Sequence, residues 1–183
     1  ASGGGYANTN YYFDDSQGYP DYPFALEALQ GVTSNGIPLS AVDYNPQTNI
    51  VHITQGTNVA GYLTWGANGG QGSGYATNGG VIFHGNSSWY IIETIESYNG
   101  QVVQDFPQGN FVKWFSVNAF GGANYSNTPI GAVTHVEEPS APGCENSRVY
   151  FGSWVAGKNF GICAWNSRQT PVFQAVGDPF VTK

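Results

Sequence analysis

The stretch Trp89-Tyr-Ile-Ile-Glu-Thr-Ile-Glu-Ser97 decides the fold class, because its apolar residues follow one another instead of alternating with polar ones. The stretch Ile130-Gly-Ala-Val-Thr-His-Val136 has the same character. Strands of this kind are typical of a sheet that is covered on both faces. Helices that connect parallel strands provide such cover, so the two stretches indicate a mostly parallel sheet.

Amphipathic segments that can form the covering helices lie between the apolar runs. In residues 21–32, apolar side chains recur at helical spacing behind Asp21, the expected N-cap, and an early Pro, and Asn35-Gly36 ends the pattern. Asparagines that can cap a helix precede or begin three further amphipathic segments. We therefore predict three more helices, over residues 111–119, 146–156 and 159–167.

Short apolar runs between these helices predict strands. They are Thr9–Phe13, Leu39–Tyr44, Asn49–Thr54, Val59–Trp65, Trp89–Ile95, Ile130–Val136 and Val172–Val176. Residues 66–80 contain seven Gly and predict a surface loop. The chain is thus expected to form a single α/β domain over residues 1–183, with a mostly parallel sheet flanked by helices. The abundance of Gly, Asn, Tyr and Thr leaves a mainly β sandwich with short helices as the alternative.

Charge and hydropathy exclude two classes of partner. The five Lys and Arg residues are scattered among 183 residues, and the net charge is −7, so no basic surface for a phosphate backbone is expected. The apolar runs are much shorter than the roughly 18 residues of a membrane-spanning helix. We therefore predict that the protein binds no nucleic acid and has no membrane span.

The beginning of the chain and its cysteines bear on location. The sequence has no Met and starts Ala1-Ser2-Gly3, which predicts that a secretion signal or a longer precursor segment has been removed. We expect a secreted or extracytoplasmic protein. Cys144 and Cys163 lack the spacing of metal ligands. An oxidising compartment favours their pairing, whereas the two late helices would hold them apart, so their state is left open.

Polar residues follow most of the predicted strands, at the edge of the sheet where ligands bind in α/β proteins. The candidate ligand-binding residues are Asp14, Asp15, Trp65, Asn68, Glu96, Asn99 and Glu138. Asp14, Asp15, Glu96 and Glu137 would hold a hard cation such as Ca²⁺ if they converge, and no other cofactor is predicted. Alternatively, their repulsion raises one carboxyl pKa and creates a general acid, or the carboxylates merely end strands.

Four sequence blocks resemble one protein family. They are Ala60-Gly-Tyr-Leu-Thr-Trp-Gly-Ala-Asn68, Trp89-Tyr-Ile-Ile-Glu-Thr-Ile-Glu-Ser97, Ile130-Gly-Ala-Val-Thr-His-Val-Glu-Glu-Pro139 and Phe173-Gln-Ala-Val-Gly-Asp-Pro-Phe180. From Tyr11 onward the chain resembles the C-terminal part of an uncharacterised family of secreted bacterial proteins. That family is distantly similar to gingipain and caspase-type cysteine peptidases. The resemblance implies a caspase-like α/β fold.

The resemblance also locates a missing catalytic dyad. Peptidases of this fold have a His-Gly pair after one strand and a Cys after the next, because the thiol needs an imidazole to form its thiolate. The corresponding positions here are Trp65-Gly66 and Glu96-Ser97. A substitute dyad could combine His84, in Val81-Ile-Phe-His-Gly85, with Cys163. Cys163, however, falls inside a predicted helix, where a thiol is usually a buried apolar group.

His135 is a further candidate, because Glu137 follows it at the same-face spacing of a strand. Such a pair could transfer protons, although a structural His is the more common case. A carboxylate cluster of Glu96, Glu137 and Glu138 could also support hydrolysis. His52 alternates with Val51 and Ile53, so we expect it to face outward without a partner.

These observations predict a secreted, non-catalytic, peptidase-like α/β domain that binds a ligand or assembles outside the cell; enzymatic activity stays open. The alternatives are an active hydrolase, with a cysteine or with carboxylates, and a carbohydrate-binding module. The last follows from five Trp and twelve Tyr residues, since sugar rings stack on exposed aromatic rings. Low charge density would permit self-association, and a matrix polysaccharide is the other partner considered.

Overall fold

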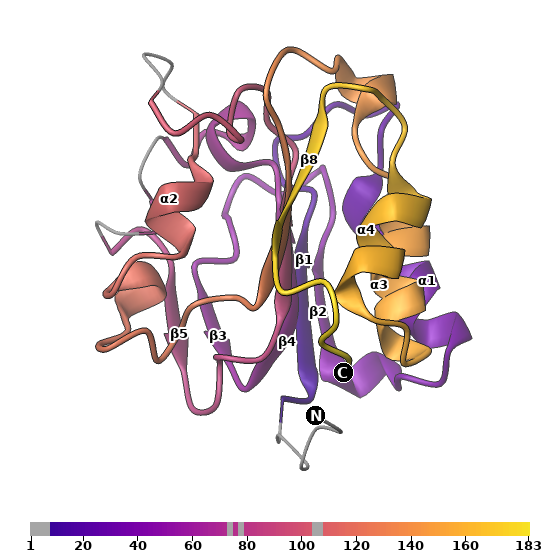
Figure 1. The fold of residues 1–183 in the computed structure, drawn as a ribbon. Helices are drawn as coiled ribbons and strands as arrows, with labels where there is room; N and C mark the ends of the chain where they lie inside the picture. Colours follow the sequence, from indigo (N-terminus) through magenta and orange to yellow (C-terminus); the bar gives the residue numbers. More distant parts are fainter. Residues whose placement is uncertain (1–7, 73–74, 77–78, 104–107) are drawn as a thin grey trace.

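The computed structural model describes residues 8–72, 75–76, 79–103 and 108–183. Its centre is a six-stranded sheet with the strand order β2-β1-β4-β6-β7-β8 (Figure 1). The strands are β1 (Asn10–Asp14), β2 (Val42–Asn45), β4 (Val59–Thr64), β6 (Ile91–Thr94), β7 (Gly131–His135) and β8 (Phe173–Gly177). Adjacent strands are parallel except β7 and β8, which pair antiparallel. The prediction of a mostly parallel α/β sheet flanked by helices is confirmed, and the β-sandwich alternative is wrong.

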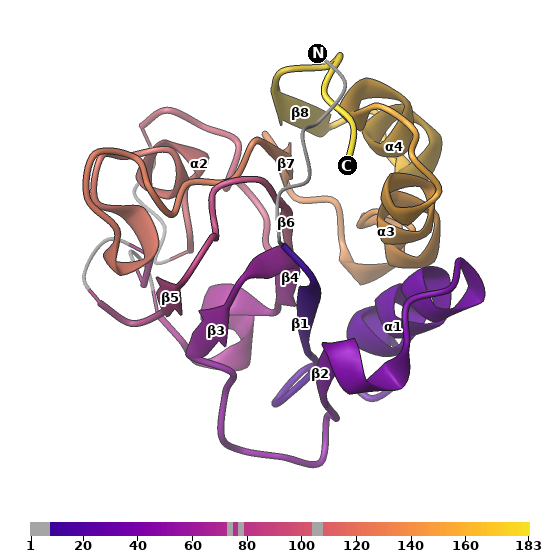
Figure 2. The same ribbon diagram turned by 90° about the horizontal axis from the view of Figure 1, so that it is seen from below.

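Different kinds of element cover the two faces of the sheet. Helices α1 (Phe24–Ser34), α3 (Ser147–Val155) and α4 (Phe160–Ser167) cover one face (Figure 2). The other face carries a two-stranded parallel sheet, β3 (Gln55–Thr57) with β5 (Ile82–His84), and the short helix α2 (Phe111–Trp114). Short 3₁₀ turns lie in the connections: η1 (Leu39–Ala41), η2 (Gly66–Gly69), η3 (Ala119–Gly121) and η4 (Ala141–Gly143).

Each face has its own hydrophobic core, because side chains of a strand alternate between the two faces. On the helical face, Ile91 and Val133 pack with Phe151 and Phe160. On the opposite face, Ile92 and Ala132 pack with an aromatic group whose rings contact one another: Tyr62, Phe83, Tyr90 and Phe120. The alternation directs Glu93 and His135 toward the helices, since each is two residues from an apolar residue of the helical core.

Asparagine caps begin three of the helices, as predicted. The side chain of Asn110 accepts from the N–H of Val112, that of Asn146 from Val149, and that of Asn159 from Ile162. Helix α1 differs, because the residue before it, Pro23, offers no capping side chain. The carboxylate of Asp15 accepts from the N–H groups of Ala25 and Leu26 instead, and so takes the role expected of Asp21.

The structure corrects several predicted boundaries. Residues 49–54 form no strand: the N–H of Ile53 donates to Asp14, and the carbonyl of Val51 accepts from Asn45, so side chains occupy groups that a strand would pair. Residues 39–41 form η1, and α2 ends at Trp114 instead of near residue 119. The predicted loop over residues 66–80 begins with η2; its residues 73–74 and 77–78 lie outside the described part of the chain.

Within the described residues, no helix has the length and apolar character needed to cross a membrane. Cys144 and Cys163 are both buried free thiols, which resolves the question that the sequence left open.

Candidate functional site

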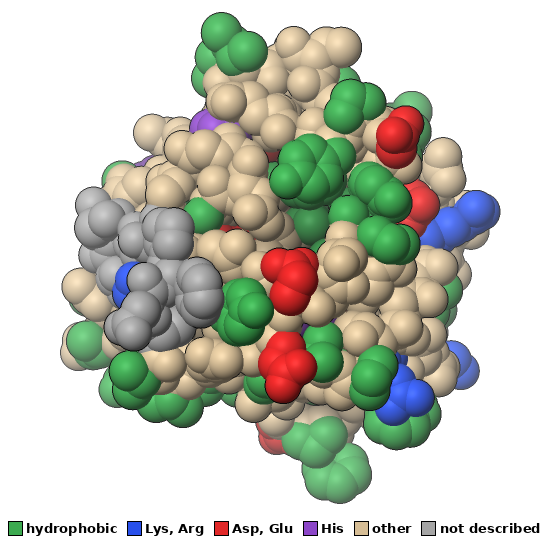
Figure 3. All heavy atoms as spheres, turned by 90° about the horizontal axis from the view of Figure 1, so that it is seen from above, with side chains coloured by type: hydrophobic (Ala, Val, Ile, Leu, Met, Phe, Trp, Pro, Cys, Tyr) green, Lys and Arg blue, Asp and Glu red, His purple; other side chains and the backbone are tan. Residues whose placement is uncertain are grey.

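A small pocket opens at the carboxyl edge of the sheet, where the ends of β4, β6 and β7 meet. Its volume is about 100 Å³. The lining residues come from four connections: Tyr19, Trp65, Asn68, Ile95, Glu96, Ser97, Gln108, Glu138, Pro139, Ser140, Ala141 and Cys144. Figure 3 looks down on this edge, and acidic side chains lie near the middle of the face. The predicted ligand-binding residues Trp65, Asn68, Glu96 and Glu138 are therefore brought together in one pocket.

One wall of the pocket is aromatic. Trp65 is 1% exposed, and its indole N–H donates to the carboxylate of Asp15 at 3.1 Å. Tyr19 is 56% exposed and packs edge-on against the Trp65 ring, with the ring centroids 5.1 Å apart. The buried indole therefore fixes one side of the tyrosine, while the other side remains available to a ligand.

Glu96 is held against the backbone of two other connections. Its Oε1 accepts from the N–H of Ala67 at 2.9 Å and from the N–H of Gly109 at 2.7 Å. Gly66 has a φ of +54°, and a Cβ on it would lie 2.5 Å from the carboxyl carbon of Glu96. Burial raises the pKa of Glu96, and the two N–H donors oppose that rise. The carboxyl group thus joins the ends of β4 and β6 and the segment before α2.

The carboxylates at the end of β1 have a structural role. Asp14 accepts from the N–H groups of Ser16 and Ile53 and from the side chain of Asn45. Asp15 accepts from Trp65 and from the first turn of α1, as described above. All four carboxylate oxygens of the two residues thus accept at least one hydrogen bond within the protein. Neither residue lines the pocket.

The four residues predicted to bind Ca²⁺ do not converge. Among the described residues, no three His, Cys, Asp or Glu side chains are grouped so that they could hold a metal ion. The carboxylate oxygens of Asp14 and Asp15 accept hydrogen bonds within the protein, as described above. Glu96 accepts from the N–H groups of Ala67 and Gly109, and Glu137 is exposed. The prediction failed because the carboxylates of Asp14, Asp15 and Glu96 accept hydrogen bonds from neighbouring backbone N–H groups, and Glu137 is exposed to solvent instead of facing them.

His135 pairs with a residue other than the predicted Glu137. Its Nε2 lies 3.3 Å from Oε1 of Glu145, and both side chains are fully buried. Its Nδ1 lies 3.2 Å from the carbonyl oxygen of Glu96. Glu93 points to the same side of the sheet and accepts a hydrogen bond from Ser147 at 2.7 Å. The sequence analysis missed Glu93 and Glu145, although an acid inside the apolar run 89–95 is itself a sign of a special environment.

The proposed His84–Cys163 dyad does not form. His84 ends β5 on one face of the sheet, whereas Cys163 lies in α4 on the other face (Figures 1 and 2). The thiol of Cys163 contacts the carbonyl oxygen of Lys158, and burial raises its pKa to about 12. Cys144 reaches the pocket, but burial and the neighbouring Glu145 raise its pKa far above the usual range for a thiol. Both thiols are therefore poor nucleophiles.

His52 has partners, in contrast to the prediction. Its Nδ1 lies 2.8 Å from Oγ of Ser16, and its Nε2 lies 3.2 Å from the amide nitrogen of Gln17. The same amide donates to the carbonyl of Ile50, which fixes its orientation and makes Nε2 the acceptor. The proton of neutral His52 is thus on Nδ1, where it is donated to Ser16. In this tautomer the imidazole cannot take the proton of the Ser16 hydroxyl.

The remaining candidates fall into two groups. Asn99 is buried and structural, because its amide donates to Thr94 and its side-chain oxygen accepts from the N–H of His135. Asn68 and Glu138 line the pocket; Asn68 donates to the carbonyl of Ile95, and Glu138 accepts from the N–H of Ser140. Tyr19, Gln108 and Ser140 were not predicted, since each lies in a connection with no pattern of its own.

Comparisons of the chain with protein-family models, with curated proteins and with solved structures find no match. The resemblance to gingipain and caspase-type peptidases therefore rests on the quoted sequence blocks alone.

Proposed function

We propose that the protein is an extracytoplasmic, non-catalytic binding domain of caspase-like fold, and that its pocket takes a hydroxyl-bearing group of an extracellular polysaccharide. One observation carries this proposal: a half-exposed aromatic ring, Tyr19, stands beside amide, hydroxyl and carboxylate groups in a single pocket. Sugar rings combine an apolar face with a rim of hydroxyl groups, so this combination suits them.

The size of the pocket supports recognition of one projecting group. A volume of about 100 Å³ has room for about three water molecules, at roughly 30 Å³ each. Pockets for whole drug-sized ligands are several times larger. A polymer that inserts one sugar edge beside Tyr19, and lays its neighbouring units on the surface around the pocket, fits this volume.

The state of the reactive groups supports binding over hydrolysis. Cys144 and Cys163 have raised thiol pKa values, His135 is enclosed, and His52 donates to Ser16. The resemblance noted above adds that the dyad positions of cysteine peptidases correspond to Trp65-Gly66 and Glu96-Ser97. One feature favours a carboxylate-based hydrolase as the second candidate: Glu96 lines the pocket and has a raised pKa, as a general acid requires.

The test compares Tyr19→Ala with Tyr125→Ala in binding to an array of neutral oligosaccharides. Tyr125 is 58% exposed and does not line the pocket, so it is a matched control. We expect an oligosaccharide to bind the wild type, and its affinity to fall by up to about tenfold in Tyr19→Ala, because a stacked ring contributes about 0.5–1.5 kcal/mol. The affinity should be unchanged in Tyr125→Ala.

Equal loss in both tyrosine variants, or no binding to any oligosaccharide, would contradict the proposal. Release of reducing ends by the wild type that stops in Glu96→Gln would establish the hydrolase instead.

A further inference from the structure

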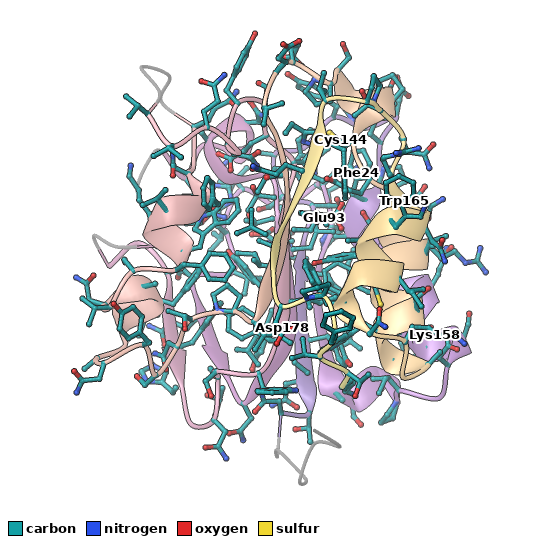
Figure 4. All side chains as sticks on the ribbon, in the orientation of Figure 1. Phe24, Glu93, Cys144, Lys158, Trp165 and Asp178 are labelled. Carbon is teal, nitrogen blue, oxygen red and sulfur yellow. The ribbon has the colours of Figure 1, made fainter. Side chains whose placement is uncertain are left out.

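A series of contacts between buried polar groups connects the residues that line two opposite walls of the pocket. The carbonyl oxygen of Glu96, on one wall, contacts Nδ1 of His135. On the other side of the ring, Nε2 of His135 faces Glu145. Glu145 directly follows Cys144, which lines the opposite wall with residues 138–141. In Figure 4, Cys144 lies nearer the carboxyl edge than Glu93, which completes the group from below. We call His135, Glu145 and Glu93 the buried acid cluster.

The contact between His135 and Glu145 needs a proton. A carbonyl oxygen can only accept, so Nδ1 of His135 must donate to Glu96 and therefore carries a hydrogen. A neutral ring then presents a lone pair at Nε2, 3.3 Å from Oε1 of Glu145. An ionised carboxylate also has only lone pairs. The contact is therefore attractive only when one further proton lies on Nε2 or on the carboxyl group.

The described part of the chain offers few donors that could replace this proton. Within it, Oε2 of Glu93, both carboxyl oxygens of Glu145 and Nε2 of His135 are buried without a hydrogen-bond partner. The hydroxyl of Ser147 is the donor to Glu93. This differs from Asp14 and Asp15, whose oxygens all accept hydrogen bonds.

The titratable groups around the cluster are mostly acidic. Glu27 of α1, which interacts with Arg148 of α3, and Asp15 at the end of β1 both act on Glu93. The other titratable groups are Cys144 and Glu138 in the pocket wall and Tyr150 in α3. A second negative charge on the cluster would thus be placed among groups of the same sign, in a region of low dielectric.

We propose that the buried acid cluster is a proton-operated latch on the pocket: with its protons bound it holds residues 138–145 against the sheet, and loss of a proton releases them. What the pocket binds rests on the proposed function, whereas the latch itself does not. The backbone hydrogen bonds of this segment include local ones, from Gly143 to Ser140 and from Cys144 to Ala141. The side chain of Glu145 adds a polar contact to the sheet through His135. Cys144 packs in the helical core, and the N–H of Asn146, directly after the segment, donates to the carbonyl of Ser167.

Burial, together with the mutual repulsion of the acids, raises the pKa of Glu93 well above the ordinary 4.5. Burial also raises the pKa of Glu145, and His135 opposes that rise. The closed state therefore binds protons more tightly than a state in which the segment is open to water. Opening is consequently favoured as pH rises, by about tenfold per pH unit for each proton lost.

Cys144 and Cys163 make opening measurable in the intact protein. Cys144 lies in the latched segment, and Cys163 is an internal control in α4. The experiment measures the rates at which 4,4′-dithiodipyridine modifies the two thiols, each divided by its rate in the urea-unfolded chain, which removes the intrinsic effect of pH. We expect the Cys144-to-Cys163 ratio to rise at least about tenfold between about pH 5 and about pH 8.

Two isosteric variants and one control complete the design. Glu145→Gln and Glu93→Gln remove a titrating group each, and we expect either to flatten the pH dependence of the ratio. Glu137→Gln removes one exposed carboxylate from the neighbouring connection and should behave as the wild type. A wild-type ratio that does not change with pH overturns the latch, even if a variant fails to fold. The latch is also overturned if Glu137→Gln flattens the pH dependence of the ratio as much as the two cluster variants do. Because no ligand is added, failure here is distinct from failure of the proposed function.

Discussion

Buried acids lie at the end of β1 and also in the buried acid cluster, which is formed by β6, β7 and the connection before α3, but their hydrogen bonding differs between the two regions. At β1, Asp15 accepts hydrogen bonds from Ala25, Leu26 and Trp65, and Asp14 is equally well satisfied. In the buried acid cluster, three of the four carboxyl oxygens have no hydrogen-bond partner among the described residues, although Oε1 of Glu145 lies 3.3 Å from Nε2 of His135. In the first region, hydrogen bonds from Ala25, Trp65 and Leu26 oppose the rise in the pKa of Asp15 that burial causes, whereas the second region has few such donors and requires bound protons.

The difference follows from what lies opposite each acid. Asp15 faces the first turn of α1, which presents N–H groups that have no partner within the helix. Glu93 faces the side of α3 at Ser147, where one hydroxyl is the donor. A buried carboxylate with three donors can stabilise the fold, while one with a single donor costs stability whenever it is charged.

The largest expected effect is at Asp15. Asp15→Ala leaves the N–H groups of Ala25 and Leu26 and the indole of Trp65 without their acceptor, so we expect the free energy of unfolding at neutral pH to fall by about 3 kcal/mol, or roughly 1 kcal/mol for each donor. Urea denaturation measures this. Asp43→Ala, at an exposed position of β2, is the matched control and should change stability by less than about 0.5 kcal/mol. Similar values for the two variants would show that Asp15 does not hold α1.

A smaller effect of opposite sign is expected at Glu93. Glu93→Gln keeps an oxygen that can accept from Ser147 but removes the cost of an unpartnered carboxyl group. We expect unfolding at about pH 8 to require about 1–2 kcal/mol more than in the wild type, and the gain to disappear near about pH 4.5. Denaturation at both pH values measures it, with Glu137→Gln as control. A variant that is less stable than the wild type at both pH values would contradict the comparison.

Much of the fold could be predicted, because its elements leave local signals. The caps at Asn110, Asn146 and Asn159 and the continuous apolar runs of β6 and β7 are visible in the sequence. The opposite face could not be predicted in the same way. Strands β3 and β5 have three residues each, which is too short to show a periodicity. That face is held together by stacked rings such as Phe83 and Phe120, and hydrophobic periodicity does not predict such ring contacts.

The pocket was predictable only in part. Trp65, Asn68, Glu96 and Glu138 follow strands, so the topology of a parallel sheet brings them to one edge. The roles of the acids were not predictable, because they depend on which donors lie opposite. Asp14 and Asp15 accept hydrogen bonds from backbone N–H groups. Glu145 lies in a connection without hydrophobic periodicity and contacts His135.

The dependence of wild-type stability on pH tests the central claim most directly. Burial raises the pKa of Asp15, Glu93, Glu96 and Glu145 above the ordinary values of 3.8 for Asp and 4.5 for Glu. A raised pKa means that the folded state binds more protons than the unfolded state, so this stabilisation is complete below the ordinary values and is lost as pH rises through the raised ones.

We predict that the free energy of unfolding, measured by urea denaturation, decreases from about pH 4.5 to about pH 8 by at least about 1.4 kcal/mol, the equivalent of one pKa unit. We also predict that Glu93→Gln reduces the decrease. A free energy of unfolding that stays constant or increases over this range would contradict the account.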